Sequence, residues 1–307
     1  MKILVTGGAG FIASHLVDRL ITEGHHVIVI DNLSAGRREN VHPKALFYKI
    51  DICDAAALEE VFRRETPDII NHHAAHVNVR KSVEMPVYDA SINILGSLNL
   101  CELWRKYQVK KFIYVSTGGA VYGEPKSLPV KETNPIEPLS QYGVSKHTVE
   151  HYLSIFHKLY GLHFTILRYP NVYGPRQSPH GEAGVVAIFS ELILKNMSPT
   201  IFGDGTKTRD YVFVDDIVTA NLAVMDDRGN GEVYNLGWGK EISDLDVFYA
   251  VRRALKSNIE PIFGQKRPGE IDHISLDSTK AAKELNWKPK IHFEEGVQVA
   301  TEYYQKK

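Results

Sequence analysis

The chain has 307 residues, with 36 Lys and Arg against 37 Asp and Glu, and 43 % of its residues are hydrophobic, which predicts one large or two moderate globular domains. This balance leaves no clustered basic excess for nucleic acid or an anionic membrane surface, so neither partner is expected. Two cysteines cannot build a disulfide framework, and no apolar run reaches the roughly 18 residues of a membrane-spanning helix, so we expect a soluble, cytoplasmic protein.

The first half of the chain alternates short β-branched runs with longer stretches of helical periodicity. We predict strands over residues 3–6, 27–31, 46–50, 69–71, 112–116 and 164–168. Between them we predict helices over residues 11–23 and 55–65, a long helical segment ending near Tyr107, and a helix over about residues 142–160. This alternation is typical of βαβ units and predicts an α/β fold with a Rossmann-type doubly wound parallel sheet.

The composition of the sequence changes after Arg168, because Pro and Gly residues are frequent from there to Gly184. A predicted helix over residues 185–195 follows, then a strand over 211–214, a helix around 215–225, and mixed short strands and helices to residue 307. We therefore predict a first domain over residues 1–168 and a smaller C-terminal α/β domain over 169–307. Some later segments, about residues 212–237, are expected to return to the first domain.

A glycine-rich loop separates the first predicted strand from the first helix. Gly7, Gly10 and Ala13 stand where a tight turn lets backbone N–H groups and a helix N-terminus approach a pyrophosphate. Asp31 closes the second strand, about where a carboxylate accepts the ribose hydroxyls of a dinucleotide, and would repel the 2′-phosphate of NADP. An ordinary βα turn with a capping Asp is the alternative. The combination predicts NAD, although Arg37 and Arg38 leave NADP open.

Tyr142 and Lys146 lie one helical turn apart in the predicted helix over about residues 142–160. An ammonium beside a phenol can lower its pKa toward that of a general base. The spacing alone is weak, because it recurs at three further places: Tyr107 with Lys111, Tyr122 with Lys126, and Tyr303 with Lys307. Only Tyr142 opens a helix between two strands of the predicted dinucleotide-binding domain, which favours a functional pair there.

These features together resemble the extended short-chain dehydrogenase/reductase family, most closely the UDP-glucose 4-epimerase group of nucleotide-sugar 4-epimerases. The resemblance runs through nearly the whole chain and is carried by residues 6–12, 31–33, 72–75, 93, 121–123, 142–146, 168–171, 209–212 and 267–270. It implies that Tyr142 takes the proton of the C4 hydroxyl of a UDP-hexose while the C4 hydride passes to NAD. The 4-keto sugar then turns its other face to the cofactor and takes the hydride back, which inverts C4.

The resemblance also implies a set of residues that border NAD, with residues 1–168 as the NAD-binding domain. They are Gly7, Gly10, Phe11, Ile12, Asp31, Asn32, Asp51, Ile52, His73, Ala74, Ala75, Asn93, Ser116, Tyr142, Lys146 and Tyr169. Lys146 would hold the nicotinamide ribose and keep a positive charge near Tyr142.

One departure from the family pattern concerns the third catalytic residue. The family usually has Ser or Thr where this chain has Gly118, so Thr117 is expected to supply the hydroxyl; a loop-capping role for Thr117 is the alternative. Related 4,6-dehydratases carry an Asp–Glu pair just before Val–Tyr–Gly, and related decarboxylases a Glu. Gly119 and Ala120 occupy those positions here, so neither reaction is expected.

For the nucleotide-sugar end, the resemblance implies that residues 169–307 bind a UDP-sugar. Arg209 and Arg267 would clamp the diphosphate with Asn171, and residues 200–202 would line the uracil, with Phe202 as the stacking face. The implied substrate-binding set is Thr117, Gly118, Tyr142, Asn171, Val185, Val186, Thr200, Ile201, Phe202, Arg209, Arg267, Glu270 and Ile274. Ile274, at the family's gate over the sugar 2-substituent, favours glucose and galactose but leaves N-acetylhexosamine and glucuronate forms open.

Several further expectations complete the sequence-based hypothesis. His72, His73 and His76 have no supporting thiolate or carboxylate nearby in sequence, so no metal is expected. Apolar positions around residues 92–104 and 149–156 form a homodimer seam, as in homologues, or simply cover the sheet. A non-catalytic dinucleotide sensor and an NADPH-consuming 4-ketoreductase are the competing functions. The proton-transfer pair and the arginines argue against the first, and Asp31 against the second.

Overall fold

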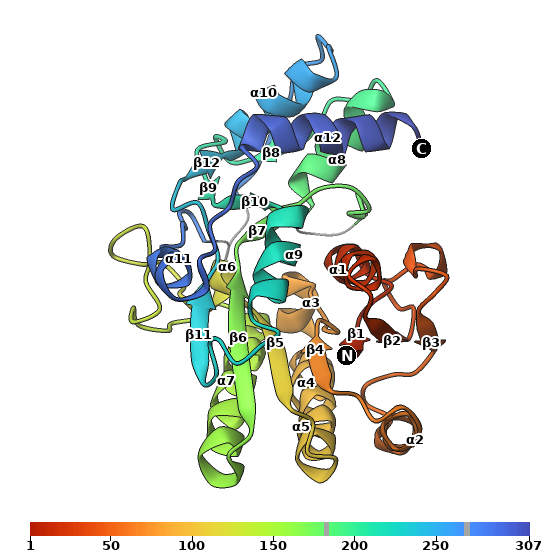
Figure 1. Ribbon diagram of the computed structural model, residues 1–307. Helices are drawn as coiled ribbons and strands as arrows, with labels where there is room; N and C mark the ends of the chain where they lie inside the picture. The colour runs from red at the N-terminus through yellow and green to blue at the C-terminus, as the bar shows by residue number, and fades with distance from the viewer. Residues whose placement is uncertain (181–183, 267–270) are drawn as a thin grey trace.

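A seven-stranded, all-parallel sheet forms the centre of the protein, which we describe from a computed structural model covering residues 1–180, 184–266 and 271–307. The strand order is β11-β6-β5-β4-β1-β2-β3 (Figure 1). The strands are β1 (Lys2–Thr6), β2 (His26–Ile30), β3 (Leu46–Tyr48), β4 (Ile69–His72), β5 (Lys111–Thr117), β6 (His163–Tyr169) and β11 (Glu232–Asn235). The order runs outward in both directions from β1 and β4, which confirms the predicted Rossmann-type sheet.

Both faces of the sheet are buried, which explains the nearly continuous β-branched runs of its strands. Alternate residues of β1 enter two hydrophobic clusters: Ile3 and Val5 belong to one, and Leu4 to the other. The first cluster is completed by α1 (Phe11–Thr22) and α9 (Val214–Ala223), the second by α2 (Ala55–Glu65), α5 (Ser97–Lys106) and α7 (Gln141–Tyr160). The sheet is therefore covered by helices on both sides.

The predicted long helical segment before Tyr107 is divided into four pieces. These are α3 (Val79–Glu84), α4 (Pro86–Ala90), a π-helical turn η2 (Ser91–Gly96), and α5. Met85 leaves the helical conformation, with φ −131° and ψ 63°, because the residue before a proline is disfavoured in the α region. The π turn inserts one residue and thereby re-aims the side chains that follow α4.

The rest of the chain forms a second layer beyond the carboxyl edge of the sheet. It contains α6 (Gly118–Val121) and three two-stranded sheets: β7 (Asn171–Tyr173) with β10 (Tyr211–Phe213), β8 (Thr200–Phe202) with β13 (Ile262–Gly264), and β9 (Thr208–Arg209) with β12 (Ile242–Ser243). The helices α8 (Val185–Leu194), α10 (Asp244–Ala254) and α12 (Phe293–Gln305) pack on one another above these strands (Figure 1). A short η1 (Arg38–Asn40) and α11 (Thr279–Leu285) complete the described elements.

After α9 the chain returns from the second layer to the large sheet, where β11 pairs in parallel with β6. Within the described part of the chain, no helix is both long enough and apolar enough to cross a membrane.

Candidate active site

The glycine loop between β1 and α1 has the geometry of a phosphate cradle. Gly7 has φ +69°, and its N–H donates to the Ile30 carbonyl at 2.8 Å. A Cβ on Gly7 would lie only 2.8 Å from the Ala74 backbone nitrogen, so a side chain there would collide with the loop after β4. Helix α1 begins at Phe11 with Gly10 as N-cap and no side-chain cap, which leaves its first N–H groups for an anionic ligand.

Asp31 lies directly after β2 and faces this loop. The side chain is 8 % exposed; its Oδ2 accepts from Ala9 N at 3.0 Å and its Oδ1 from Leu33 N at 2.7 Å. Burial raises the pKa of Asp31, while these two hydrogen bonds act in the opposite direction. The carboxylate is thus fixed at the end of β2, and its remaining lone pairs fit the ribose hydroxyls of a dinucleotide.

Neighbouring polar side chains frame the same edge. Asn32 Nδ2 donates to Asp51 Oδ2 at 2.8 Å, which ties the segment after β2 to the segment after β3. The two arginines that kept NADP open are engaged elsewhere: Arg37 pairs with Glu39 at 3.3 Å, and the Arg38 guanidinium lies 4.5 Å from the centroid of the Phe47 ring. A carboxylate at this end of β2, with both arginines occupied, fits NAD.

A directional chain of hydrogen bonds runs beneath the loop that follows β4. Thr6 Oγ1 accepts from Ala74 N at 3.1 Å and lies 2.7 Å from His72 Nδ1, while His72 Nε2 lies 2.8 Å from Ser97 Oγ. Since Ser97 Oγ donates to the Asn93 carbonyl at 2.6 Å, the proton of His72 must be on Nε2, and Nδ1 accepts from Thr6. Burial lowers the pKa of His72 well below its usual range, so the ring is a neutral structural link.

Two predicted cofactor residues border a buried polar cluster. Tyr169 OH accepts from Asn221 Nδ2 at 2.6 Å, and Asn221 Oδ1 accepts from Asn71 Nδ2 at 3.0 Å. The His73 ring lies 6.0 Å from that of Tyr169, and its Nε2 is buried with no hydrogen-bond partner among the described residues. Burial, with the charge of Lys146, lowers the pKa of His73 to about 3. A neutral ring with one unpaired nitrogen suits the border of a polar cofactor.

The expected catalytic residues lie at the end of β5 and in the first turns of α7. Thr117 is the last residue of β5, and its side chain lies near enough to the Tyr142 phenol to favour the ionised form of that phenol. Helix α7 starts at Gln141 because Ser140 Oγ caps it by accepting from Gly143 N at 3.2 Å. Lys146, one turn further, is buried, and its Nζ lies 4.2 Å from the centroid of the Tyr114 ring.

The protonation of this trio differs from the sequence-based expectation at one point. Burial, then the charge of Asp89, raises the pKa of Tyr142 to about 12, and the Thr117 hydroxyl acts in the opposite direction. Burial lowers the pKa of Lys146 to about 7, although Glu150 and Asp89 favour its charged form. The Lys146 ammonium faces the Tyr114 ring. In this structure the surroundings of Tyr142 therefore keep its phenol protonated.

A buried ion pair supports α7 from behind. Glu150 accepts from Arg168 Nε at 3.0 Å and Nη2 at 2.5 Å, from Ser116 Oγ at 2.5 Å, and lies 2.8 Å from His147 Nδ1. Burial would raise the pKa of Glu150, but the His147 and Arg168 hydrogen bonds hold it at about 2. The hydroxyl of Ser116, which is predicted to border the cofactor, uses its proton to donate to Glu150.

The glycine that replaces the family's hydroxyl residue has a packing reason. A Cβ on Gly118 would lie 2.3 Å from Leu276 Cδ1, because Leu276 fills the space beside α6. A Ser or Thr at position 118 would displace that side chain. Thr117 is therefore the hydroxyl that the structure brings to Tyr142.

The predicted sugar-nucleotide residues are distributed over the second layer. Asn171 is in β7, Val185 and Val186 begin α8, residues 200–202 form β8, and Arg209 is in β9. Arg209 Nη1 donates to the carbonyls of Thr208 at 2.7 Å and Asp272 at 3.3 Å.

Two predicted contact side chains in this layer are buried in hydrophobic clusters. Ile201 is 1 % exposed within the main core, and Ile274 is 2 % exposed in a small cluster with Val121 and Leu276. Ile201 can therefore contact a nucleotide only through its backbone, because its side chain is buried. Arg267 and Glu270 lie outside the described residues.

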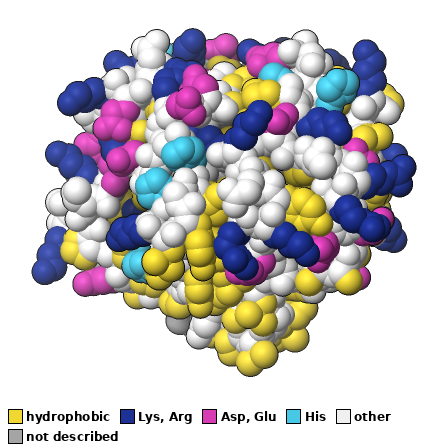
Figure 2. Space-filling model, turned by 60° about the horizontal axis from the view of Figure 1, so that its bottom comes forward, with side chains coloured by type: hydrophobic (Ala, Val, Ile, Leu, Met, Phe, Trp, Pro, Cys, Tyr) yellow, Lys and Arg dark blue, Asp and Glu magenta, His cyan; other side chains and the backbone are white. Residues whose placement is uncertain are grey.

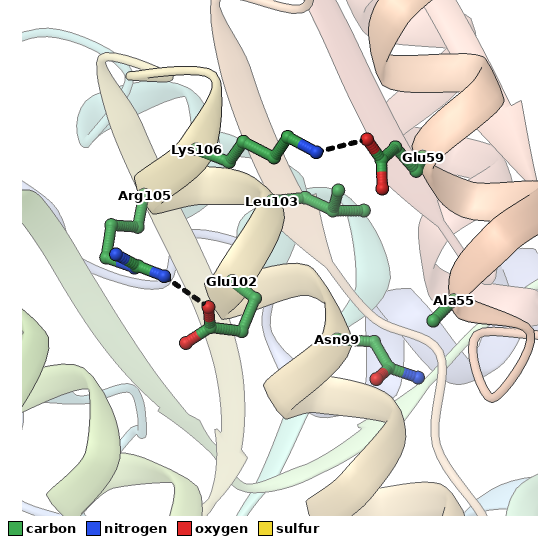
Figure 3. Close-up of a pocket in the computed structure, with 7 residues that line it drawn as sticks. All are labelled: Ala55, Glu59, Asn99, Glu102, Leu103, Arg105 and Lys106. Atoms are coloured by element: carbon green, nitrogen blue, oxygen red, sulfur yellow. Dashed lines mark hydrogen bonds and ion pairs between the residues drawn. The ribbon is translucent and has the colours of Figure 1, made fainter.

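A surface hollow between α2 and α5 is separate from this site (Figure 3). Its charged residues pair with one another, Lys106 with Glu59 and Arg105 with Glu102, and Asn99 Nδ2 donates to the Ile52 carbonyl at 2.9 Å. The hollow is the groove between two packed helices, and its charged side chains are paired with one another.

Two residues that were not predicted from the sequence, Asp89 and Glu150, act on the expected catalytic residues, and Arg168 pairs with Glu150. One signal was present, because Tyr142, Lys146 and Glu150 follow one another at intervals of four residues and share a face of α7. Asp89 likewise precedes Asn93 by four residues, but the π turn between them is not visible in the sequence.

Known proteins match the chain along its length. The NAD dependent epimerase/dehydratase family model matches residues 3–237. UDP-glucose 4-epimerase of Mycolicibacterium smegmatis is 43 % identical over 312 residues, covering 100 % of this chain and 99 % of that protein.

Solved structures agree in fold. The crystal structure of UDP-glucose 4-epimerase with UDP-glucose from Thermotoga maritima is 49 % identical, with a TM-score of 0.98 over 100 % of this chain and 99 % of that chain. UDP-glucose 4-epimerase from Thermus thermophilus in complex with NAD is 42 % identical, with a TM-score of 0.96 over 99 % of each chain.

Proposed function

The chain belongs to the NAD-dependent epimerase/dehydratase family, and on that premise we propose that it is a UDP-glucose 4-epimerase, an isomerase that interconverts UDP-glucose and UDP-galactose. The observation that carries the proposal is the contact of Thr117 with Tyr142, next to a dinucleotide cradle, in a chain 49 % identical to a UDP-glucose 4-epimerase. Neither Gly119 nor Ala120, just beyond Thr117, can supply the acid and base that an elimination needs.

The chain's own groups divide the chemistry at C4 between them. NAD, held by the glycine loop and Asp31, supplies the hydride acceptor and donor when it is bound. Tyr142 exchanges a proton with the C4 oxygen, and Thr117 orients that oxygen through a second hydrogen bond. Lys146 provides the positive charge that favours an ionised phenol during the exchange. The other predicted cofactor residues, from Gly7 to Tyr169, remain part of this proposal.

We assign the UDP-sugar to the second layer. Arg209 and Arg267 would bind the diphosphate with Asn171, and Phe202, a partly buried ring beside Gly264, would lie against the uracil. Val185, Val186, Thr200, Glu270 and Ile274 complete the set. UDP-N-acetylglucosamine and UDP-glucuronate are the alternative substrates, because a buried Ile274 is smaller than a Tyr gate.

The same proposal divides the chain into two functional parts. Residues 1–168 hold NAD, with residues 212–237 returning to that part, and residues 169–307 hold the nucleotide sugar. The pairing of β11 with β6 and the mutual packing of α8, α10 and α12 support this division.

We further propose a homodimer formed through α3, α4, η2 and α7, which pack on one another. Large apolar side chains on these elements are exposed, among them Val87 at 81 % and Leu159 at 67 %. Others are Val83, Met85, Leu95, Val144 and Ile155. Figure 2 shows hydrophobic side chains gathered in this way at the lower edge of the molecule. Such a patch is typical of a surface that a second copy covers.

Substrate conversion followed by NMR tests the proposed function. Purified protein is incubated separately with UDP-glucose, UDP-galactose, UDP-N-acetylglucosamine and UDP-glucuronate, first without added cofactor and then with NAD. We expect the C4 epimer to form from UDP-glucose and UDP-galactose. Conversion of only an N-acetylated or uronate substrate would move the specificity to that sugar, and no epimer from any substrate would contradict the proposal.

A further inference from the structure

Asp89 is a buried carboxylate beside the catalytic helix. It lies on α4, which packs against α7, and is 1 % exposed. Its Oδ1 accepts from Asn93 Nδ2 at 3.0 Å and from His76 Nδ1 at 3.1 Å. Its Oδ2 is buried and has no hydrogen-bond partner among the described residues. A carboxylate with half of its acceptors unused is costly to bury, so packing alone does not account for it.

Hydrogen bonds fix this carboxylate relative to the catalytic tyrosine. The same Asn93 Nδ2 lies 3.2 Å from Ser145 Oγ, and Ser145 Oγ donates to the Tyr142 carbonyl at 3.0 Å. The Tyr142 N–H donates to Ser82 Oγ on α3 at 3.1 Å. The position of Asp89 is thus set against the first turn of α7 by a continuous series of contacts.

The charge of Asp89 acts on both members of the acid–base pair. It raises the pKa of Tyr142 and favours the charged form of Lys146, because an anion opposes a phenolate and stabilises an ammonium. The other ionisable groups around it are His76 from the loop after β4, Tyr114 from β5, and Glu150 on α7.

We propose that Asp89 is a positioning residue that sets the charge balance of the Tyr142–Lys146 pair, and that His76 and Asn93 hold its carboxylate in place. The inference rests on the proposed function, in which Tyr142 exchanges a proton with the sugar. Asp89 keeps the phenol protonated and Lys146 charged. Without the anion, the phenol ionises more readily and the ammonium is discharged more readily.

The variant Asp89→Asn tests this, since its amide oxygen still accepts from His76 and Asn93 but carries no charge. The pH dependence of kcat for UDP-galactose is measured in the NAD-loaded enzyme. We expect the acidic limb, which reports ionisation of Tyr142, to move to lower pH by about one unit. Asp18→Asn is the matched control, because Asp18 is on α1 and pairs with Arg176 at 2.6 Å. The acidic limb of this variant should stay at the wild-type pH. A kcat lowered equally at every pH, with the limb unmoved, would assign Asp89 a merely structural role.

A second variant keeps the test decisive if Asp89→Asn does not fold. His76→Phe retains a ring against Tyr88, whose centroid lies 5.3 Å from that of His76, but removes the donor to Asp89. The buried carboxylate then loses one of its two donors and is protonated more readily, so the acidic limb should move to lower pH, in the same direction as in Asp89→Asn. A limb at the wild-type pH or above it would overturn the proposal.

A spectroscopic readout separates this inference from the proposed function. Tyrosinate absorbance is titrated without substrate, and the signal lost in Tyr142→Phe identifies that residue. We expect this signal at lower pH in Asp89→Asn than in the wild type, and an unchanged position would contradict the inference. Absence of epimerisation by the wild type would instead contradict the proposed function, while the titration still decides the role of Asp89.

Discussion

The phenol of Tyr142 receives opposing influences from its immediate neighbours. Burial and Asp89 hold it protonated, whereas the Thr117 hydroxyl favours its ionised form. The four-residue spacing between Tyr142 and Lys146 predicts that the ammonium acts directly on the Tyr142 phenol. In the structure the ammonium lies over the Tyr114 ring. In the proposed mechanism the Thr117 hydroxyl therefore takes the place of the Ser or Thr hydroxyl that is absent at Gly118.

Replacing Thr117 with Val removes the hydroxyl and keeps the shape of the side chain. We expect kcat for UDP-galactose to fall about 100-fold, because one positioned hydrogen-bond partner of the reacting oxygen is lost, while KM changes little. Thr148→Val on α7 is the matched control, since its Oγ1 donates only to the Val144 carbonyl at 2.8 Å. An unchanged kcat in Thr117→Val would leave Thr117 with a loop-capping role.

Replacing Glu150 with Gln leaves the buried Arg168 guanidinium without its counter-ion. The free energy of unfolding, measured by urea denaturation at neutral pH, should fall by about 3–5 kcal/mol. Glu102→Gln, which breaks an exposed pair with Arg105, should lower it far less, because solvent screens a surface ion pair. Similar losses in the two variants would show that the buried pair contributes no more than a surface one.

The same pair has a pH dependence of fixed sign. The pKa of Glu150 in the folded protein, about 2, lies below its ordinary value of 4.5. The carboxylate therefore stabilises the fold fully above about pH 4.5, and this contribution is lost as pH falls toward 2. Acid unfolding of the wild type should steepen in that window, and Glu150→Gln should lack this part of the slope.

At the scale of elements, each turn that carries function depends on a local backbone requirement. The β1–α1 turn needs a residue with φ +69° and no side chain, because the loop after β4 passes directly over it. Helix α7 needs its Ser140 cap to place Tyr142 in the first turn. Both requirements are visible in the sequence as a glycine and a serine at helix-start positions.

Gly7→Ala should therefore abolish tight NAD binding, since a methyl group would collide with the Ala74 nitrogen. Calorimetric titration of the cofactor-free protein with NAD should show at least a tenfold loss of affinity. Gly24→Ala is the matched control: Gly24 also has positive φ, at +84°, but a Cβ there meets nothing within 4 Å. It should lose about 1 kcal/mol of stability and keep its NAD affinity. Equal NAD affinities in the two variants would contradict the cradle.

The sequence predicted the elements better than it predicted their connections. Strands such as β1 and helices such as α8 follow from β-branched runs and helical periodicity, so they were found nearly residue for residue. The π turn at residues 91–96 was not, because an inserted residue alters which side chains share a face without changing composition. Asp89 was missed for this reason, and Leu276 beside Gly118 because their contact spans 158 positions of sequence.

At the scale of the whole molecule, the parallel sheet gathers the chemistry at one edge. The loops after β1, β2, β4 and β5 all end there, and the second layer lies beyond that edge. The neighbouring helices α4 and α7 carry the buried Asp89 and Lys146 and also exposed apolar side chains such as Val87 and Leu159. The proposed dimer would therefore cover the elements that position Tyr142.

Val87→Asp places a charge at the most exposed apolar side chain of this surface. We expect sedimentation velocity to show a dimer for the wild type and a monomer for the variant, because a buried, unpaired carboxylate disfavours the interface. Met197→Asp, at a side chain 53 % exposed after α8, should remain dimeric. A monomeric wild type would contradict the dimer proposal.

The central claim, a redox-neutral inversion at C4, is tested most directly by converting UDP-galactose in deuterium oxide with only the NAD that the protein retains or is loaded with. The account predicts that UDP-glucose forms with its original hydrogen still at C4, because that hydrogen leaves and returns within one binding event and never exchanges with solvent. Deuterium at C4 of the product, or a requirement for one equivalent of reduced cofactor per turnover, would contradict it.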